Sequence, residues 1–243
     1  QSREILYVTC SCGENYPGAS VSIGTGMPKG FVPVGGISMI ERSVRILKSC
    51  GIERIIIGTG YHKEWYENLA KREEGIVCVF SPRFAETNSM YTLWNCREVI
   101  GEDDFLLLES DLVFEQKAIT SLLECKEPDV MLISPVTKFQ DQYYVESDEH
   151  GVLTRCSVNK EELNAKGELV GIHKLSGKFF SLMCQDYAKI AESKPKLGYE
   201  YELLSMSQRI SPVFVLNVPG LAWYEIDDSD DLAYAEKHIL SKL

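Results

Sequence analysis

The sequence of 243 residues contains no apolar run near the roughly 20 residues that a membrane-spanning helix needs, and no signal peptide. It is also short of positive charge, because 25 Lys and Arg residues stand against 36 Asp and Glu residues, a net charge of -11. A protein this acidic is not expected to bind nucleic acid or an anionic membrane surface. These absences predict a cytoplasmic protein. They do not argue against the binding of small phosphorylated ligands.

Cysteine and histidine patterns typical of metal sites are missing as well. Of the eight Cys residues only Cys10 and Cys12 lie close together, and no second pair stands at zinc-finger spacing. The four His residues are dispersed along the chain. We therefore interpret the cysteines as reduced cytosolic thiols and do not expect a zinc site.

Three catalytic signatures are also absent. A Gly-rich stretch at 24–30 is not followed by the Gly-Lys-Ser/Thr run that opens the helix of a Walker loop. No G-x-S-x-G elbow is present, which argues against a serine hydrolase. No G-x-G-x-x-G follows the first predicted strand, which argues against a dinucleotide oxidoreductase.

The sequence does contain a regular alternation of short apolar runs and amphipathic segments. Strands are predicted at 4–9, 54–58, 76–80, 104–108 and 129–134, with helices between them at 38–50, 62–72, 90–97 and 115–125. The second half predicts a hairpin at 143–155, a strand at 168–174, helices from 176 and 199, strands at 213–218 and 221–226, and a closing helix from Asp228. This alternation predicts an α/β fold.

We expect one domain over residues 1–243. Its fold is predicted to be Rossmann-like, with a mixed, mostly parallel sheet flanked by helices and a small β-rich insertion at about 138–175. The insertion is expected to form a lid. The sequence leaves open a homodimer and a further domain after Leu243.

Two acidic sites follow buried runs. Asp111 follows the predicted strand at 104–108 by three positions, and Asp227 closes the run at 221–226. Carboxylates at strand ends lie where open α/β sheets bind ligands, and a divalent cation is their common companion there. The alternative for Asp111 is that it only caps a helix beginning near Glu115. Asp228 is better interpreted as the N-cap of the last helix than as a ligand.

A Gly-rich loop and a lysine complete the pattern. The loop at 24–30 exposes backbone N–H groups suited to phosphate, and Lys29 adds a positive charge. Two carboxylates, such a loop and a lysine are typical of metal-assisted chemistry on a phosphate, for which positioning and charge neutralisation suffice.

Several short motifs resemble those of the sugar-nucleotidyltransferase superfamily, in matching order along nearly the whole chain. They are Met27-Pro28-Lys29-Gly30, Val34-Gly35-Gly36, Ile40-Glu41-Arg42, Gly51-Ile52, Gly58-Thr59-Gly60-Tyr61, Asn88-Ser89-Met90-Tyr91-Thr92-Leu93, Glu109-Ser110-Asp111 and Glu225-Ile226-Asp227. Within the superfamily, the segments at 85–91, 107–111 and 167–172 resemble the 2-aminoethylphosphonate cytidylyltransferases more than the bacterial choline-phosphate cytidylyltransferases. The resemblance implies transfer of CMP from CTP to a small zwitterionic phosphonate or phosphate, with release of pyrophosphate.

The resemblance also implies roles for individual residues. Asp111 and Asp227 would hold Mg²⁺, and Lys29 would contact phosphates of the nucleotide and the acceptor. A second lysine, Lys160, would approach the reacting phosphorus, so the implied catalytic residues are Lys29, Lys160 and Asp111. The implied nucleotide contacts are Thr9, Cys10, Gly13, Lys29, Asn88 and Ser89.

The acceptor subsite is implied in the same way. Tyr143 matches an aromatic wall beside a cationic head, and the acceptor contacts implied by the resemblance are Glu86, Asn88, Tyr143, Tyr199, Glu200 and Glu202. The sequence does not choose between Glu200 and Glu202. A Tyr at 143, where the choline branch suggests Trp, favours a primary amine over trimethylammonium.

The first loop departs from the family pattern. The family's first strand runs into an Ala-Ala-Gly-x-Gly-Ser/Thr-Arg loop, whereas here Thr9-Cys10-Ser11-Cys12-Gly13 precedes an extended stretch at 16–26 without an Arg. The departure leaves two alternatives beside the phosphonate enzyme. One is a choline-phosphate cytidylyltransferase, and the other is a non-catalytic domain that binds a nucleotide.

Overall fold

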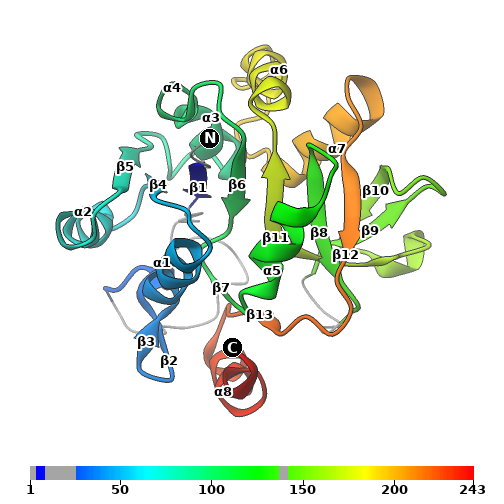
Figure 1. Ribbon diagram of the computed structural model, residues 1–243. Helices are drawn as coiled ribbons and strands as arrows, with labels where there is room; N and C mark the ends of the chain where they lie inside the picture. The colour runs from blue at the N-terminus through cyan, green and yellow to red at the C-terminus, as the bar shows by residue number, and fades with distance from the viewer. Residues whose placement is uncertain (1–3, 9–25, 137–141) are drawn as a thin grey trace.

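A mixed sheet with helices on both faces forms the body of the protein (Figure 1). The structure, a computed structural model, describes residues 4–8, 26–136 and 142–243. Its strands are β1 (Glu4–Val8), β2 (Pro33–Val34), β3 (Ile37–Ser38), β4 (Arg54–Thr59), β5 (Ile76–Phe80), β6 (Phe105–Leu108), β7 (Leu112–Phe114), β8 (Val130–Ser134), β9 (Tyr144–Ser147), β10 (Leu153–Ser157), β11 (Gly167–Leu175), β12 (Phe214–Asn217) and β13 (Trp223–Glu225).

Helices connect most of these strands. They are α1 (Met39–Ser49), α2 (Lys63–Arg72), α3 (Ser89–Asn95), α4 (Arg97–Ile100), α5 (Lys117–Glu124), α6 (Gly177–Ala188), α7 (Tyr199–Arg209) and α8 (Ser229–His238), with short 3-10 turns η1 (Lys29–Phe31), η2 (Lys160–Glu162) and η3 (Leu240–Lys242). No helix in the described ranges is long and apolar enough to cross a membrane.

The main sheet has the order β10-β9-β11-β6-β1-β4-β5, with β8 beside β11 and β12 beside β8. The pairs β6–β1, β1–β4, β4–β5 and β8–β12 are parallel, whereas β11 runs antiparallel to β6, β8 and β9. The carboxyl ends of β1, β4 and β6 therefore meet at one edge, which is where such sheets bind ligands.

Alternate side chains of the central strands serve two separate cores. On β4, Ile55 and Ile57 pack with α1, α2 and α5, while Ile56 between them faces the opposite side. On β6, Leu106 and Leu108 share the first core, and Phe105 and Leu107 join α3, α6 and α7 in the second. A strand buried on both faces has an uninterrupted apolar run, which is why these strands could be recognised in the sequence.

Side-chain caps begin several helices where the sequence predicts them. Ser38 accepts a hydrogen bond from the Glu41 N–H at the start of α1, and Ser176 accepts one from the Phe179 N–H at the start of α6. Asp228 accepts from the N–H groups of Asp230 and Asp231 at the start of α8. These hydrogen bonds satisfy backbone donors that a helix leaves unpaired in its first turn.

The α/β fold class and the mixed sheet are confirmed, and two details differ from the expectations. The alternative that Asp111 caps the following helix is wrong, because β7 follows Asp111 directly and α5 begins later, at Lys117. In addition, β11 belongs to the centre of the main sheet, between β6 and β8, although its residues fall inside the predicted insertion at 138–175. The hairpin of β9 and β10 remains as the edge of the sheet, and its role as a lid stays a prediction.

Candidate functional site

The two acidic sites predicted from the sequence lie side by side. Strand β7 follows Asp111 and pairs antiparallel with β13, which ends two residues before Asp227. The Ile226 N–H extends the ladder by donating to the Asp111 carbonyl oxygen at 2.9 Å. Backbone pairing of two short strands thus brings together carboxylates that are 116 positions apart in the sequence.

Lys29 joins both carboxylates. Its Nζ donates to Asp111 Oδ2 at 2.7 Å and to Asp227 Oδ1 at 2.6 Å. The side chains of Lys29, Asp111 and Asp227 are 33%, 14% and 45% exposed, so the ion pairs lie at a partly open edge. Burial alone would lower the pKa of Lys29, but the charges of Asp111, Asp227 and Glu225 raise it above its ordinary value, and the ammonium stays protonated.

Two further carboxylates stand beside this group. One oxygen each of Glu109, Asp111 and Glu225 lies within 4.8 Å of the others. Burial, followed by the charge of Asp111, raises the pKa of Glu109 well above its usual range and that of Glu225 to about 7. The Gln142 side chain donates to Glu225 Oε2 at 2.8 Å. The cluster therefore carries more negative charge than Lys29 alone can balance.

Sequence reasoning did not assign Glu109 or Glu225 to the site. Both were visible in the motifs, because each precedes its aspartate by two positions, as Glu109-Ser110-Asp111 and Glu225-Ile226-Asp227. The repeated Glu-x-Asp spacing was the signal. Glu109 directly follows the end of β6 and Glu225 ends β13, so each motif brings two carboxylates to the end of a strand.

A buried hydrogen-bonded chain holds Glu109. The Tyr199 hydroxyl donates to Glu109 Oε1 at 2.6 Å, and His173 Nε2 lies 3.0 Å from the same hydroxyl. Burial lowers the pKa of His173 to about 3, so the ring is neutral and Nε2–H can donate to the tyrosine oxygen. Gly171, with φ +78°, leaves the necessary space, since a Cβ there would lie 2.4 Å from Glu109 Oε2.

The donor set at this edge suits a hard divalent cation. It consists of carboxylate oxygens, the ligands that Mg²⁺ and Ca²⁺ prefer. Asp111 Oδ1 is buried and accepts no hydrogen bond from any residue that the structure describes, and an oxygen in that position gains from a cation. The residues present therefore fit such an ion. Asp111 groups with Glu109 and Glu225, and Asp227 contacts Asp111 through Lys29, so the role of Asp227 as a ligand stays a prediction.

A second group of residues lies on the acceptor side predicted from the sequence. Tyr143 and Glu200 hydrogen-bond through their side chains, and the rings of Tyr143 and Tyr201 meet edge to face at 5.5 Å. Glu200 is 7% exposed. Burial raises its pKa, and hydrogen bonds from its own N–H and from Tyr143 lower the pKa by a smaller amount. Glu200 is close enough to Glu109 to contribute to the raised pKa of that carboxyl.

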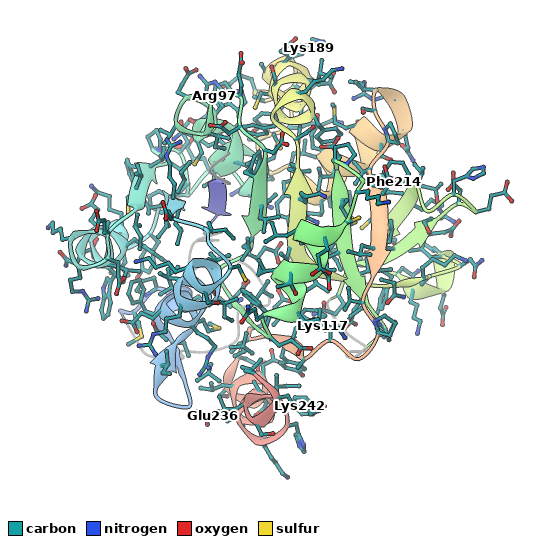
Figure 2. The ribbon with its side chains drawn as sticks, viewed as in Figure 1. Arg97, Lys117, Lys189, Phe214, Glu236 and Lys242 are labelled. Atoms are coloured by element: carbon teal, nitrogen blue, oxygen red, sulfur yellow. The ribbon has the colours of Figure 1, made fainter. Side chains whose placement is uncertain are left out.

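Two of the predicted acceptor residues point elsewhere, and a third, Glu86, lies at the surface. Tyr199 is 1% exposed and engaged with Glu109, so its ring is no wall for a substrate. Glu202 faces Asp186, which pairs with Arg209, and together they line a cavity of about 490 Å³ between α6 and α7. Lys189 of this cavity lies at the end of the molecule opposite Glu236 of α8 (Figure 2). Glu86 is 71% exposed.

Glu200 and Glu202 are two positions apart on α7, and because a helix turns by about 100° per residue, their side chains lie about 200° apart on nearly opposite faces. Only Glu200 reaches Tyr143. The structure therefore distinguishes the two glutamates that the sequence left equivalent.

The remaining predicted residues have the following surroundings. Asn88 caps α3 by accepting from the Ser89 N–H at 2.8 Å, and its amide donates to the Lys196 carbonyl oxygen at 3.3 Å. Ser89 Oγ accepts from the Tyr199 N–H at 3.0 Å. Lys160 lies on η2, with Nζ 5.8 Å from the centre of the Tyr144 ring. The predicted contacts of Thr9, Cys10 and Gly13 fall outside the described residues.

A family model and several known proteins match this chain. The MobA-like NTP transferase domain matches residues 18–175, more than half of the chain. A 2-aminoethylphosphonate cytidylyltransferase from Lancefieldella rimae is 30% identical over 92 residues, which are 38% of this chain and 37% of that protein. A CMP-5'-(3-aminopropyl)phosphonate synthase from Streptomyces rubellomurinus is 26% identical over 222 residues, 86% of this chain and 35% of that protein.

A choline-phosphate cytidylyltransferase from Streptococcus pneumoniae is 36% identical over 85 residues, 32% of this chain and 37% of that protein. The chain thus spans little more than a third of the length of each of these relatives. An inositol-1-phosphate CTP transferase from T. maritima has the same fold, with a TM-score of 0.79 at 18% identity over 99% of this chain and 96% of that one. The family resemblance drawn from the motifs is confirmed, and the chain belongs to the MobA-like NTP transferase domain family.

Proposed function

We propose that this chain transfers CMP from CTP to 2-aminoethylphosphonate and releases pyrophosphate. The observation that carries the transfer chemistry is the meeting of Lys29, Asp111 and Asp227 at the carboxyl edge of the sheet. Nucleotidyl transfer needs an in-line arrangement and neutralisation of phosphate charge, and little covalent help from the protein. A lysine between two carboxylates offers both a phosphate contact and a place for a divalent cation.

In the proposed reaction a phosphonate oxygen of the acceptor attacks the α-phosphorus of CTP. The new P–O bond joins CMP to the acceptor, and the bond from the α-phosphorus to the bridging oxygen breaks, so that pyrophosphate leaves with the electron pair. Asp111 and Asp227 would hold Mg²⁺, which when bound neutralises charge on the α-phosphate. Lys29 contacts phosphate oxygens, and Lys160 approaches the reacting phosphorus from the insertion.

The nucleotide contacts proposed from the family remain Thr9, Cys10, Gly13, Asn88 and Ser89. Ser89 and Asn88 begin α3, and Ser89 is tied to Tyr199 and through it to Glu109. This hydrogen-bonded connection between Ser89 and Glu109 supports the role proposed for the segment.

The acceptor is proposed from the chemistry around Glu200. A primary ammonium has three N–H donors that need acceptors, and leaving one unpaired in a buried place costs about 1–3 kcal/mol. Glu200 is a buried carboxylate beside an aromatic ring, held by Tyr143. Such a carboxylate gains from an ammonium partner. The two matched relatives with phosphonate acceptors in their names support the same class.

The runner-up acceptor is choline phosphate. The edge-to-face rings of Tyr143 and Tyr201, with Tyr201 39% exposed, offer an aromatic surface that a trimethylammonium group prefers. The Streptococcus pneumoniae relative supports this alternative. A domain that binds nucleotide without turnover is the third possibility, because the first loop lacks the family's arginine.

Pyrophosphate release distinguishes these possibilities. With CTP and Mg²⁺ we expect a higher kcat/KM for 2-aminoethylphosphonate than for phosphocholine, and slow turnover of ATP and GTP, because a site built for one base edge leaves polar groups unpaired with another. The variant Glu200→Gln should lower kcat/KM for the phosphonate about tenfold or more and affect phosphocholine less. A preference for phosphocholine would promote the runner-up, and no pyrophosphate with either acceptor would favour the non-catalytic domain.

A further inference from the structure

The Lys29 ammonium lies where the proposed function needs a metal ion. Its Nζ is 2.7 Å from Asp111 Oδ2 and 2.6 Å from Asp227 Oδ1. These are the two carboxylates proposed to hold Mg²⁺, and each contact is a charge-assisted hydrogen bond, the stronger kind. A divalent cation bridging Asp111 Oδ2 and Asp227 Oδ1 would compete with the ammonium, because both cations would lie within about 3 Å of these two oxygens and would repel each other.

We propose that Lys29 occupies the cation position of the nucleotide-free protein, and that a divalent cation gains it only when nucleotide phosphates draw the ammonium away. This inference rests on the proposed function, since it takes the same carboxylates as metal ligands. It also predicts an order of binding. Metal and nucleotide bind together, whereas metal without nucleotide binds weakly.

The surroundings of Lys29 allow such an exchange. The side chain is 33% exposed, so the ammonium can reach a ligand at the open edge. Its backbone is held in place, because the neighbouring Phe31 is buried and its ring contacts Trp65 and Tyr66 at 5.3 and 5.0 Å. The exchange therefore needs rotation of one long side chain and no movement of η1.

The energetics explain why phosphate is needed. A free divalent cation entering the site must break two charge-assisted hydrogen bonds of Lys29, and the displaced ammonium gains only water in return. A triphosphate offers the ammonium new anionic oxygens and offers the cation further ligands, which Mg²⁺ takes readily together with one or two carboxylates. The nucleotide and the metal therefore strengthen each other's binding, and this coupling is reciprocal.

The test is direct binding of Mn²⁺ without nucleotide, followed by the paramagnetic signal of the free ion. Mn²⁺ prefers the same oxygen ligands as Mg²⁺. Wild type should bind Mn²⁺ weakly, and Lys29→Met should bind it at least about tenfold more tightly, because the competing ammonium is gone. The same variant should bind the Mg²⁺ complex of CTP more weakly than wild type, since a phosphate contact is lost. The two effects have opposite signs.

Three control variants locate the effect. Lys29→Arg keeps a cation between the carboxylates and should retain the weak Mn²⁺ binding of wild type. Lys63→Met removes a lysine that pairs with Glu67 at 2.7 Å on the surface of α2 and should change neither measurement. The double variant Lys29→Met with Asp111→Asn should lose the tight Mn²⁺ binding, which places the ion at Asp111.

Mn²⁺ binding by Lys29→Met that is no tighter than that of wild type would overturn the inference. If this variant melts below the assay temperature, Lys29→Gln carries the same expectation, because its amide can still donate to a carboxylate while its charge is removed. Pyrophosphate release is measured separately. Wild-type turnover together with unchanged Mn²⁺ affinity in Lys29→Met refutes only the exchange, whereas tight Mn²⁺ binding by Lys29→Met while wild type releases no pyrophosphate refutes only the proposed reaction.

Discussion

Several carboxylates at the sheet edge lie close to one another although their negative charges repel. Glu109, Asp111 and Glu225 approach within 4.8 Å of one another, and their mutual repulsion adds to burial in raising the pKa values of Glu109 and Glu225. Lys29 offsets part of this charge. A cluster that destabilises itself is typical of a site kept for binding and catalysis.

The aspartates give the sharpest activity test at this scale. Asp111→Asn or Asp227→Asn should lower turnover about 1,000-fold or more, because each removes a proposed metal ligand, and a loss of several kcal/mol of charge stabilisation corresponds to several factors of ten. Thermal melting should show that both variants still fold, because the Asn side-chain oxygen can still accept a hydrogen bond from Lys29. Near-normal, Mg²⁺-dependent turnover in either variant would show that the pair does not hold the metal.

Glu202, which lies away from the carboxylate cluster, allows a test of how the free energy of unfolding depends on pH. Burial, and then the charge of Asp186, raises its pKa from 4.5 to about 7. The native state therefore binds this proton more tightly than the unfolded chain. The resulting stability is complete below about pH 4.5 and is lost as pH rises through about 7, a change of about 3 kcal/mol at most.

Glu202→Gln should remove this dependence, raising the free energy of unfolding at pH 8 while changing it little at pH 4.5. Urea denaturation at both pH values measures the difference. Glu149→Gln, at an 88% exposed position, serves as the matched control and should shift both values equally. A variant at position 202 that is no more stable than wild type at pH 8 would contradict the raised pKa.

At the scale of elements, two short strands and one helix build the sheet edge that carries Asp111 and Asp227. β7 and β13 are three residues each, too short to be conspicuous in a sequence, yet their pairing aligns Asp111 with Asp227. Helix α8 begins directly after them and reaches back to the segment near Lys29. Glu236, labelled in Figure 2, accepts a hydrogen bond from the Gly35 N–H at 3.0 Å, so α8 connects the last acidic motif to the β2–β3 turn.

The cap of α8 separates a structural aspartate from a proposed catalytic one. Asp228 accepts from the N–H groups of Asp230 and Asp231, both at 2.9 Å. Asp228→Ala should lower the free energy of unfolding by about 1 kcal/mol, measured by urea denaturation. Asp228→Asn should keep both stability and turnover, because Asn caps helices as well as Asp does. A loss of turnover in Asp228→Asn as large as in Asp227→Asn would make Asp228 a ligand instead.

At the scale of the whole molecule, the mixed sheet separates two of the three hydrophobic cores found in the described residues, and the carboxyl edge of its parallel strands adjoins the carboxylate cluster. The parallel strands β1, β4 and β6 bring their carboxyl ends to this edge, and the antiparallel β11 lies against β6 (Figure 1). Its register shifts between Leu169 and His173, where Gly171 makes space for Glu109. The irregular strand thus supplies both the gap for Glu109 and, through His173, the support for the tyrosine that holds it.

Much of this architecture follows from the sequence by itself. Apolar runs such as 105–108 identify doubly buried strands, and Ser38, Asn88, Ser176 and Asp228 mark helix starts. These features are local, since each depends on a few neighbouring residues and on the period of helix or strand. The acidic motifs ending in Asp111 and Asp227 were visible for the same reason.

Only the tertiary structure decided which residues meet. The insertion of β11 between β6 and β8 depends on pairing between distant segments, which no local pattern encodes. The start of α7, Tyr199-Glu200-Tyr201-Glu202, alternates rings and acids without an apolar stripe, so the sequence did not indicate which side of the helix would be buried. Packing turned Tyr199 to Glu109, Glu200 to Tyr143 and Glu202 to Asp186, because a helix directs successive side chains about 100° apart and its orientation is set by its neighbours.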